Sequence, residues 1–213
     1  MKTVAVIDYG MSNLRSVSKA LEHVAGNNWR VIVTDNAEAI IKADKIVFPG
    51  QGAMGNCMNL LKQTNVTTTI EQVLANEKPF LGICLGLQTL LTDSEENGGT
   101  NGFNWIAGTV RNFTKSLDLE NNKQLKIPHM GWNQVEQTKD HPLWANIPNN
   151  SRFYFVHSYY VEPQDNSVIA GTTSYGNLDF VSVIAQNNVF AVQFHPEKSQ
   201  QIGLTLLNNF LDW

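Results

Sequence analysis

The chain has 213 residues, a formal net charge of −4 and 42% hydrophobic residues, a composition that supports a buried core and excludes a disordered chain. The slightly acidic balance offers no basic surface for nucleic acid or an anionic membrane, and two cysteines cannot build a disulfide framework. No apolar stretch approaches the roughly 18 residues of a membrane span and the apolar start is too short for a secretion signal, so we expect one cytoplasmic domain over residues 1–213.

Up to residue 91, short apolar runs alternate with helical patterns. Residues 3–7 are rich in β-branched side chains and predict a buried strand, whereas Leu14, Val17 and Leu21 have the spacing of a helix over 14–23. The same reasoning predicts further strands at 30–33, 45–48 and 80–83, and helices at 37–42, 54–61, 69–75 and 85–91. Strands separated by helices indicate an α/β fold with a mainly parallel sheet covered on both faces.

Beyond residue 93 the helical patterns give way to short strands with polar turns. These strands are predicted at 110–113, 153–156, 168–170, 180–185 and 189–194. We expect them to be antiparallel additions to the sheet. A closing helix is predicted over 199–212 with Ser199 as its cap, and the polar stretches 94–102 and 118–126 are expected to be mobile loops.

A cysteine follows the predicted strand 80–83 and is flanked by two glycines, Gly82 and Gly86. Strand, Gly-x-Cys-x-Gly and helix in this order are typical of a nucleophile elbow, here with Cys84 as nucleophile. The glycines let the backbone pass closely through a strained turn, and the following helix start offers a positive dipole and the N–H of Leu85. The alternative is a buried cysteine that serves as a small apolar side chain.

A cysteine nucleophile needs a base, and the base needs an orienting group. His195 ends a strand-like run, Pro196 favours a turn, and Glu197 can then reach back to one imidazole nitrogen. Alone, this His-Pro-Glu stretch is more typical of a surface turn. Together with the cysteine elbow it predicts a Cys84–His195–Glu197 triad.

The glycine-rich loop after strand 45–48 is the expected second donor of an oxyanion hole. Its strand should lie near strand 80–83, so a backbone N–H of Gln51 or Gly52 could point at the carbonyl attacked by Cys84. Gly50, Gly52 and Gly55 also spell a dinucleotide-type motif, but it follows the third strand and lacks the required acidic residue. No zinc spacing is present, and we expect neither metal nor cofactor.

Residues 82–88 and 193–197 resemble the class I, or triad, glutamine amidotransferase family. More narrowly, the chain resembles the glutaminase subunits of imidazole glycerol phosphate synthases. This resemblance rests on segments in the expected order along nearly the whole chain: 8–17, 49–53, 128–133, 154–160 and 195–199. Gln51 and the pair Met11-Ser12 depart from the pattern, which leaves the second oxyanion donor and the shape of a docking loop open.

The resemblance implies a three-layer, flavodoxin-like fold and the hydrolysis of glutamine to glutamate and ammonia. The ammonia would pass to a (β/α)₈-barrel cyclase subunit of histidine biosynthesis in a heterodimer. The substrate-binding residues implied are Gly50, Gly52, Gln88, Glu96, Ser158 and Tyr159. The candidates for the partner interface are Asn13, Met130, Trp132 and Lys198. Low activity of the isolated chain and stimulation by the partner's ligand are also expected.

Three alternatives remain open from the sequence. The same glutaminase could serve another synthase, such as a sugar amidination system. A thiol peptidase or a stress protein with a cysteine elbow has the same nucleophile, and a binding subunit could keep the fold without catalysis. Met130 and Trp132 could equally be core residues, and His129 and His157 are expected to be structural.

Overall fold

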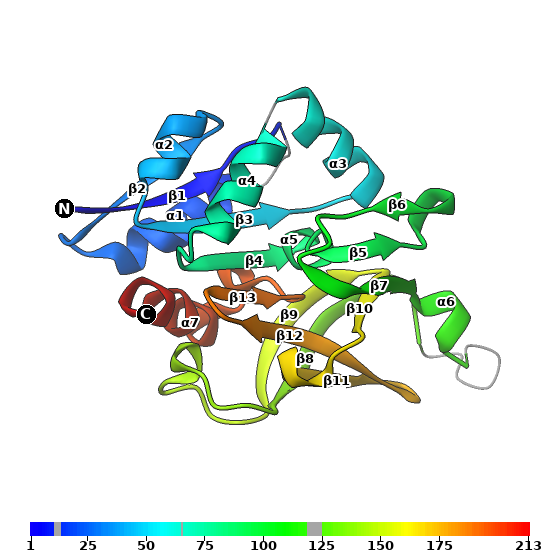
Figure 1. The fold of residues 1–213 in the computed structure, drawn as a ribbon. Helices are drawn as coiled ribbons and strands as arrows, with labels where there is room; N and C mark the ends of the chain where they lie inside the picture. Colours follow the sequence, from blue (N-terminus) through cyan, green and yellow to red (C-terminus); the bar gives the residue numbers. More distant parts are fainter. Residues whose placement is uncertain (11–13, 65, 119–124) are drawn as a thin grey trace.

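The computed structural model describes residues 1–10, 14–64, 66–118 and 125–213. Its centre is a parallel sheet in the order β2-β1-β3-β4-β13 (Figure 1). These strands are β1 (Lys2–Ile7), β2 (Trp29–Thr34), β3 (Lys45–Gly50), β4 (Phe80–Cys84) and β13 (Val189–Val192). The predicted mainly parallel sheet is therefore confirmed, and neighbouring strands pair in parallel throughout this part.

Helices cover both faces of the parallel strands, which gives the predicted three layers (Figure 1). Alternate residues of β1 explain this: Val4 and Val6 belong to the core on one face, whereas Ala5 and Ile7 belong to the core on the other. The first core contains α1 (Leu14–Ala25) and α7 (Gln200–Asp212). The second contains α2 (Ala37–Lys42), α3 (Met54–Gln63) and α4 (Val66–Ala75).

Beyond β13 the sheet continues mainly through antiparallel pairings, as predicted, although β5 and β7 pair in parallel. The path runs to β12 (Leu178–Gln186), β10 (Tyr159–Pro163), β7 (Ile106–Asn112), β5 (Leu91–Ser94) and β6 (Thr100–Asn101). A branch off β12 adds β11 (Ile169–Tyr175), β8 (His129–Gln137) and β9 (Ser151–His157). The short helices are α5 (Leu85–Gln88) and α6 (Phe113–Ser116), and the 3₁₀ turns are η1 (Glu96–Gly98), η2 (Pro142–Trp144), η3 (Asn166–Val168) and η4 (Pro196–Lys198).

Several predicted boundaries were wrong. The helix expected over 85–91 ends at Gln88, and Leu91 begins β5. Leu90 and Leu91 are fully buried, and a buried apolar run does not distinguish a helix from a strand. The expected strand 110–113 ends at Asn112, whose side chain caps α6 by accepting a hydrogen bond from the N–H of Thr114. The expected strand 189–194 ends at Val192.

The structure describes the first of the two expected loops, 94–102, in full and the second, 118–126, only in part. Residues 94–102 are not one irregular segment, because they contain η1 and β6, and β6 pairs with β5. Of the second loop, residues 119–124 lie outside the described part of the chain. Among the described helices, none is both long and apolar enough to cross a membrane.

Candidate active site

Cys84 ends β4 in a backbone conformation that side-chain-bearing residues rarely adopt, with φ 55° and ψ −105°. Such strain costs about 1–3 kcal/mol and requires close support from the surroundings. A Cβ on Gly86 would lie 2.0 Å from the carbonyl oxygen of Phe48, and one on Gly82 would lie 3.0 Å from the Cβ of Ala191. The predicted elbow is present, and its glycines are required because the neighbouring strands approach so closely.

Strand β13 delivers His195 to the elbow. Val192 of β13 is the register partner of Ile83 in β4, so the chain that follows β13 lies next to Cys84. His195 Nδ1 lies 2.8 Å from Glu197 Oε1, and both side chains are almost fully buried. The His195 carbonyl accepts a hydrogen bond from Ser199 Oγ at 2.7 Å. Ser199 is at the start of α7 as predicted, but its hydroxyl holds the His195 turn and does not cap the helix.

The electrostatics of this pair favour a protonated imidazole. Burial lowers the pKa of His195, but the opposite charges of Cys84 and Glu197 and the hydrogen bond to Glu197 outweigh burial and raise that pKa to about 10. His195 Nε2 is buried and has no hydrogen-bond partner among the described residues, as expected for a nitrogen reserved for a reacting group. Since α5 spans only 4 residues, its dipole is small, and the imidazolium is the main positive charge beside the sulfur.

The loop after β3 lies against the elbow. Gly50, the last residue of β3, is the register partner of Cys84. Tyr9 Oη donates a hydrogen bond to the Pro49 carbonyl at 3.1 Å and so fixes the start of this loop. Gly52 has φ +90°, a conformation that favours glycine. Leu85 is the first residue of α5, so its N–H has no acceptor within the helix.

A cavity of about 550 Å³ opens above the sulfur. Its lining includes the following residues predicted from the sequence: Gln51, Gly52, Cys84, Leu85, Gln88, Glu96, Ser158, Tyr159 and His195. Glu197 lies behind His195, in a small pocket that it shares with Gly50. Gly50 does not line the main cavity, since it is packed under Tyr9 and Leu85.

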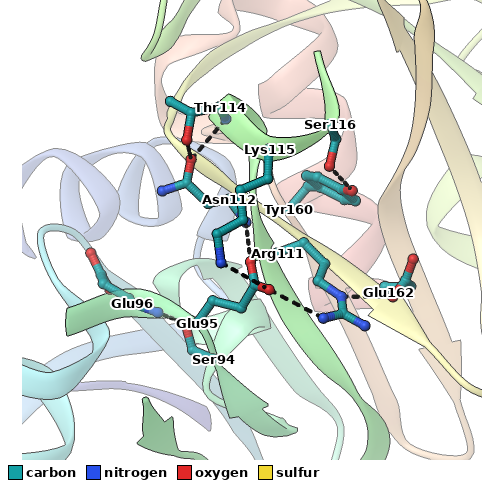
Figure 2. Close-up of polar contacts among 10 residues, drawn as sticks. All are labelled: Ser94, Glu95, Glu96, Arg111, Asn112, Thr114, Lys115, Ser116, Tyr160 and Glu162. Atoms are coloured by element: carbon teal, nitrogen blue, oxygen red, sulfur yellow. Dashed lines mark hydrogen bonds and ion pairs between the residues drawn. The ribbon is translucent and has the colours of Figure 1, made fainter. Parts of the chain in front are cut away.

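Glu96 lines the cavity and is oriented by its neighbours. Its carboxylate accepts a hydrogen bond from the Met54 N–H at 2.5 Å, and burial raises its pKa. The adjacent Glu95 turns the other way and bonds to Arg111 Nη1 at 3.2 Å and Lys115 Nζ at 3.3 Å (Figure 2). It also accepts a hydrogen bond from the backbone of Asn112, the main cause of its lowered pKa. Glu95 therefore anchors the turn that presents Glu96.

A hydrogen-bonded histidine pair borders the cavity, which His157 lines. His157 Nδ1 is 2.8 Å from the Tyr159 carbonyl, which can only accept, so this nitrogen carries the proton. His157 Nε2 must then accept from His129 Nδ1, 2.9 Å away. Burial lowers the pKa of His157 to about 3 and that of His129 to about 4. Both are neutral at pH 7 and hydrogen-bonded, as the structural role predicted for them requires.

The predicted interface residues that the structure describes lie on the surface. Met130 is 61% exposed and Trp132 is 39% exposed, both on β8, and Lys198 is exposed. The alternative of a core position for Met130 and Trp132 is therefore wrong. Asn13 lies outside the described residues.

Sequence reasoning gave no site role to Gln193, Tyr9 or Glu95. Gln193 is fully buried, and its Nε2 lies 3.5 Å from the sulfur of Cys84, from which it is separated by 109 positions in the sequence. Within the described residues, no group of three or more His, Cys, Asp or Glu is placed to hold a metal ion.

An open α/β sheet whose strand ends bring together a strained cysteine, a buried histidine and a glutamate defines a class of amide-hydrolysing enzymes. The family model described as glutamine amidotransferase class-I matches residues 5–213, and the chain belongs to this family.

Curated relatives and solved structures agree. Relatives named imidazole glycerol phosphate synthase subunit HisH are 57% identical in Hydrogenovibrio crunogenus and 54% identical in Nitrosococcus oceani. The matches cover 100% of this chain and 97% and 98% of those relatives. A solved glutamine amidotransferase shares the fold with a TM-score of 0.71 at 14% identity, covering 98% of this chain and 97% of its own. Another, from Thermotoga maritima, has a TM-score of 0.64 at 18% identity, covering 92% and 76%.

Proposed function

We propose that residues 1–213 form one amidotransferase domain that hydrolyses L-glutamine to L-glutamate and ammonia through a thioester on Cys84. The observation that carries this proposal is the juxtaposition of three groups. Cys84 is held in a strained elbow, His195 has a free Nε2 and a raised pKa, and Glu197 is bonded to the other imidazole nitrogen. The family membership supports the same chemistry.

In the first half-reaction, the Cys84 thiolate attacks the carboxamide carbon of glutamine and the carbonyl electrons move to oxygen. The N–H of Leu85 and a backbone N–H of Gln51 or Gly52 stabilise this oxyanion. As the tetrahedral intermediate collapses, the C–N bond breaks and the proton on His195 Nε2 passes to the leaving nitrogen. Ammonia departs, leaving a γ-glutamyl thioester and a neutral imidazole.

In the second half-reaction, water enters the position left by ammonia. Neutral His195 takes one proton from this water while its oxygen attacks the thioester carbon. The C–S bond then breaks, which restores the thiolate–imidazolium pair and releases glutamate. Glu197 keeps the imidazole oriented through both halves because its carboxylate holds Nδ1.

The cavity lining supports a role in glutamine binding for several polar groups near the sulfur. The Glu96 carboxylate has the charge to receive the substrate α-ammonium group, and Gly52, Ser158 and Tyr159 offer further polar contacts. Gln88 Nε2 donates to both Tyr159 O at 3.2 Å and Gln193 Oε1 at 3.0 Å. Both N–H groups of Gln88 are thus committed, so Gln88 offers its Oε1 to a substrate donor.

The ammonia is proposed to pass to a (β/α)₈-barrel cyclase subunit for histidine biosynthesis in the cytoplasm. The names of the relatives support this assignment. The exposed side chains of Met130 and Trp132, with Lys198, are the proposed contacts, and Asn13 is retained as a fourth. Large apolar side chains exposed together commonly mark a protein interface.

Glutamate release from glutamine tests the proposal, measured with and without a cyclase subunit and its nucleotide ligand. Wild type is expected to be slow alone and stimulated by the liganded cyclase, and Cys84→Ala inactive throughout. Cys57→Ala is the matched control, because Cys57 is also buried but does not line the cavity. Release that is unaffected by Cys84→Ala would contradict the chemistry. Cys84-dependent glutamate release at a rate that the cyclase does not change would assign the chain to another synthase.

A further inference from the structure

We propose that Gln193 is a further catalytic residue, which donates a hydrogen bond from its side-chain amide to the sulfur of Cys84. The hydrogen bond itself is independent of the proposed function, but the reaction in which Gln193 takes part rests on that function. The contact is 3.5 Å between Gln193 Nε2 and Cys84 Sγ, within the range for a sulfur acceptor. Gln193 thus touches the reacting atom from the segment that directly follows β13 and that carries His195 two residues further on.

The direction of this hydrogen bond follows from a backbone carbonyl. Tyr159 O can only accept, so the end of the Gln88 amide that lies 3.2 Å from it must be the NH₂ group. The same NH₂ group lies 3.0 Å from the Gln193 side chain, which must therefore present its oxygen there. The NH₂ group of Gln193 is then the end that faces the sulfur. Tyr159, Gln88 and Gln193 are linked by consecutive hydrogen bonds, and the Tyr159 carbonyl fixes the direction of each one.

Burial makes this donor effective. Gln193 is fully buried, and Cys84 is only 6% exposed, so water is largely excluded from the contact. A buried amide N–H without an acceptor is costly, and a thiolate is a stronger acceptor than a thiol. The amide therefore stabilises the negatively charged form of the sulfur, in addition to the positive charge that His195 supplies.

The same contact has a defined place in the reaction. When the sulfur carries the γ-glutamyl group it has no charge and accepts hydrogen bonds weakly. When the C–S bond breaks in the second half-reaction, the electron pair returns to sulfur and the Gln193 contact strengthens. A donor that gains strength as charge develops accelerates that step. Gln193 is thus assigned to thiolate formation and to thiolate departure.

The pH dependence of Cys84 alkylation by iodoacetamide tests this role without glutamine. The full chain is used with Cys57→Ala, so that Cys84 is the one thiol. Gln193→Leu removes the donor, and we expect alkylation at pH 7 to slow about threefold to tenfold, since hydrogen bonds to charged groups are the stronger ones. The pH midpoint should rise, and rates should converge at high pH, where the thiolate is fully formed in both proteins. A general disturbance of the site would not produce that convergence.

Gln193→Glu gives a second, shape-matched test. It keeps an acceptor for Gln88 but places a carboxylate beside the sulfur, so the midpoint should rise further than in Gln193→Leu. If Gln193→Leu does not fold, this variant decides alone. Ser182→Ala is the control. Ser182 is equally buried and lies on β12, next to β13, and among the described residues its side chain bonds to Thr173 and not to the sulfur.

Midpoints unchanged from wild type in the Gln193 variants, or shifted equally in Ser182→Ala, would overturn the assignment. Glutamate release is measured on the same samples. A shifted midpoint in a chain that does not hydrolyse glutamine would refute the proposed function and leave the Gln193–Cys84 contact established. Glutamine hydrolysis with unshifted midpoints would support the proposed function and refute the role of Gln193.

Discussion

Gly50 and Cys84 are register partners at the carboxyl ends of two adjacent parallel strands, β3 and β4. This pairing brings the glycine-rich loop beside the nucleophile, where the oxyanion must form. It also leaves no room at Gly50, since a Cβ there would lie 2.5 Å from Tyr9 Oη and 2.8 Å from Leu85 Cβ.

Gly50→Ala is therefore expected to displace the loop or Leu85. We expect a loss of about 1–3 kcal/mol in the free energy of unfolding, typical of overpacking, and a fall in kcat for glutamine hydrolysis. Denaturant unfolding and steady-state kinetics measure the two effects. Gly55→Ala is the control, because its Cβ would meet nothing closer than Thr100 Oγ1 at 3.2 Å. Normal kcat in Gly50→Ala would mean that the loop does not form the oxyanion hole.

The raised pKa of His195 predicts the high-pH limit of activity. With a pKa of about 10, the imidazolium is retained through neutral pH, and kcat/KM should fall only as the pH approaches 10. Glu197→Gln removes one of the charges that raise this pKa, so the falling limb should move to lower pH. An unchanged limb in that variant would show that Glu197 does not act through His195.

The same shift predicts a contribution to stability. His195 has a folded-state pKa above its unfolded value of about 6.5, so its stabilisation is fully present below pH 6.5 and is lost as the pH rises through about 10. Unfolding of wild type and His195→Gln, compared between pH 6 and 10, should converge as the pH rises. A difference that grows with pH would contradict the assigned charge.

Glu95 is expected to affect substrate binding although it does not line the cavity. Glu95→Gln weakens the contacts with Arg111 and Lys115 that hold the turn, so Glu96 should be less well placed (Figure 2). KM for glutamine should rise several-fold with a smaller change in kcat. Glu162→Gln is matched to it, because Glu162 also bonds to Arg111 but is distant from that turn in the sequence and more exposed. Equal effects of the two variants would rule out the anchoring role.

The neutral His157 predicts acid sensitivity. Burial lowers its pKa to about 3, so below about pH 6.5 His157 becomes protonated in the unfolded chain but stays neutral in the folded chain. The free energy of unfolding should fall by up to about 1.4 kcal/mol per pH unit from this group as the pH drops toward 4. His157→Gln should flatten this slope, whereas His23→Gln, on the exposed side of α1, should not. The same slope in both variants would contradict the buried, neutral state.

The sequence predicted the parallel strands well because β1, β3 and β4 are continuous apolar runs between helical patterns. It failed at residues 85–91, where the fully buried Leu90 and Leu91 are compatible with both a helix and a strand. It also missed β8 and β10. In β8, exposed Met130 and Trp132 break the expected apolar alternation, because these large side chains face outward.

The triad was predictable because its motifs are local: the glycines flank Cys84, and Glu197 follows His195 by two positions. Gln193 was not, because its role depends on a contact across 109 positions and on Gln88, across 105 positions. The orientation of Glu96 likewise depends on Glu95 and on the backbone of Met54, which no spacing reveals.

The covalent intermediate on Cys84 is the central claim, and hydroxylamine trapping tests it most directly. Hydroxylamine added with glutamine should intercept the thioester, so that γ-glutamyl hydroxamate appears while glutamate declines in proportion. Cys57→Ala should behave like wild type, and Cys84→Ala should yield neither product. Glutamate release that continues without hydroxamate, or that survives in Cys84→Ala, would contradict the thioester mechanism.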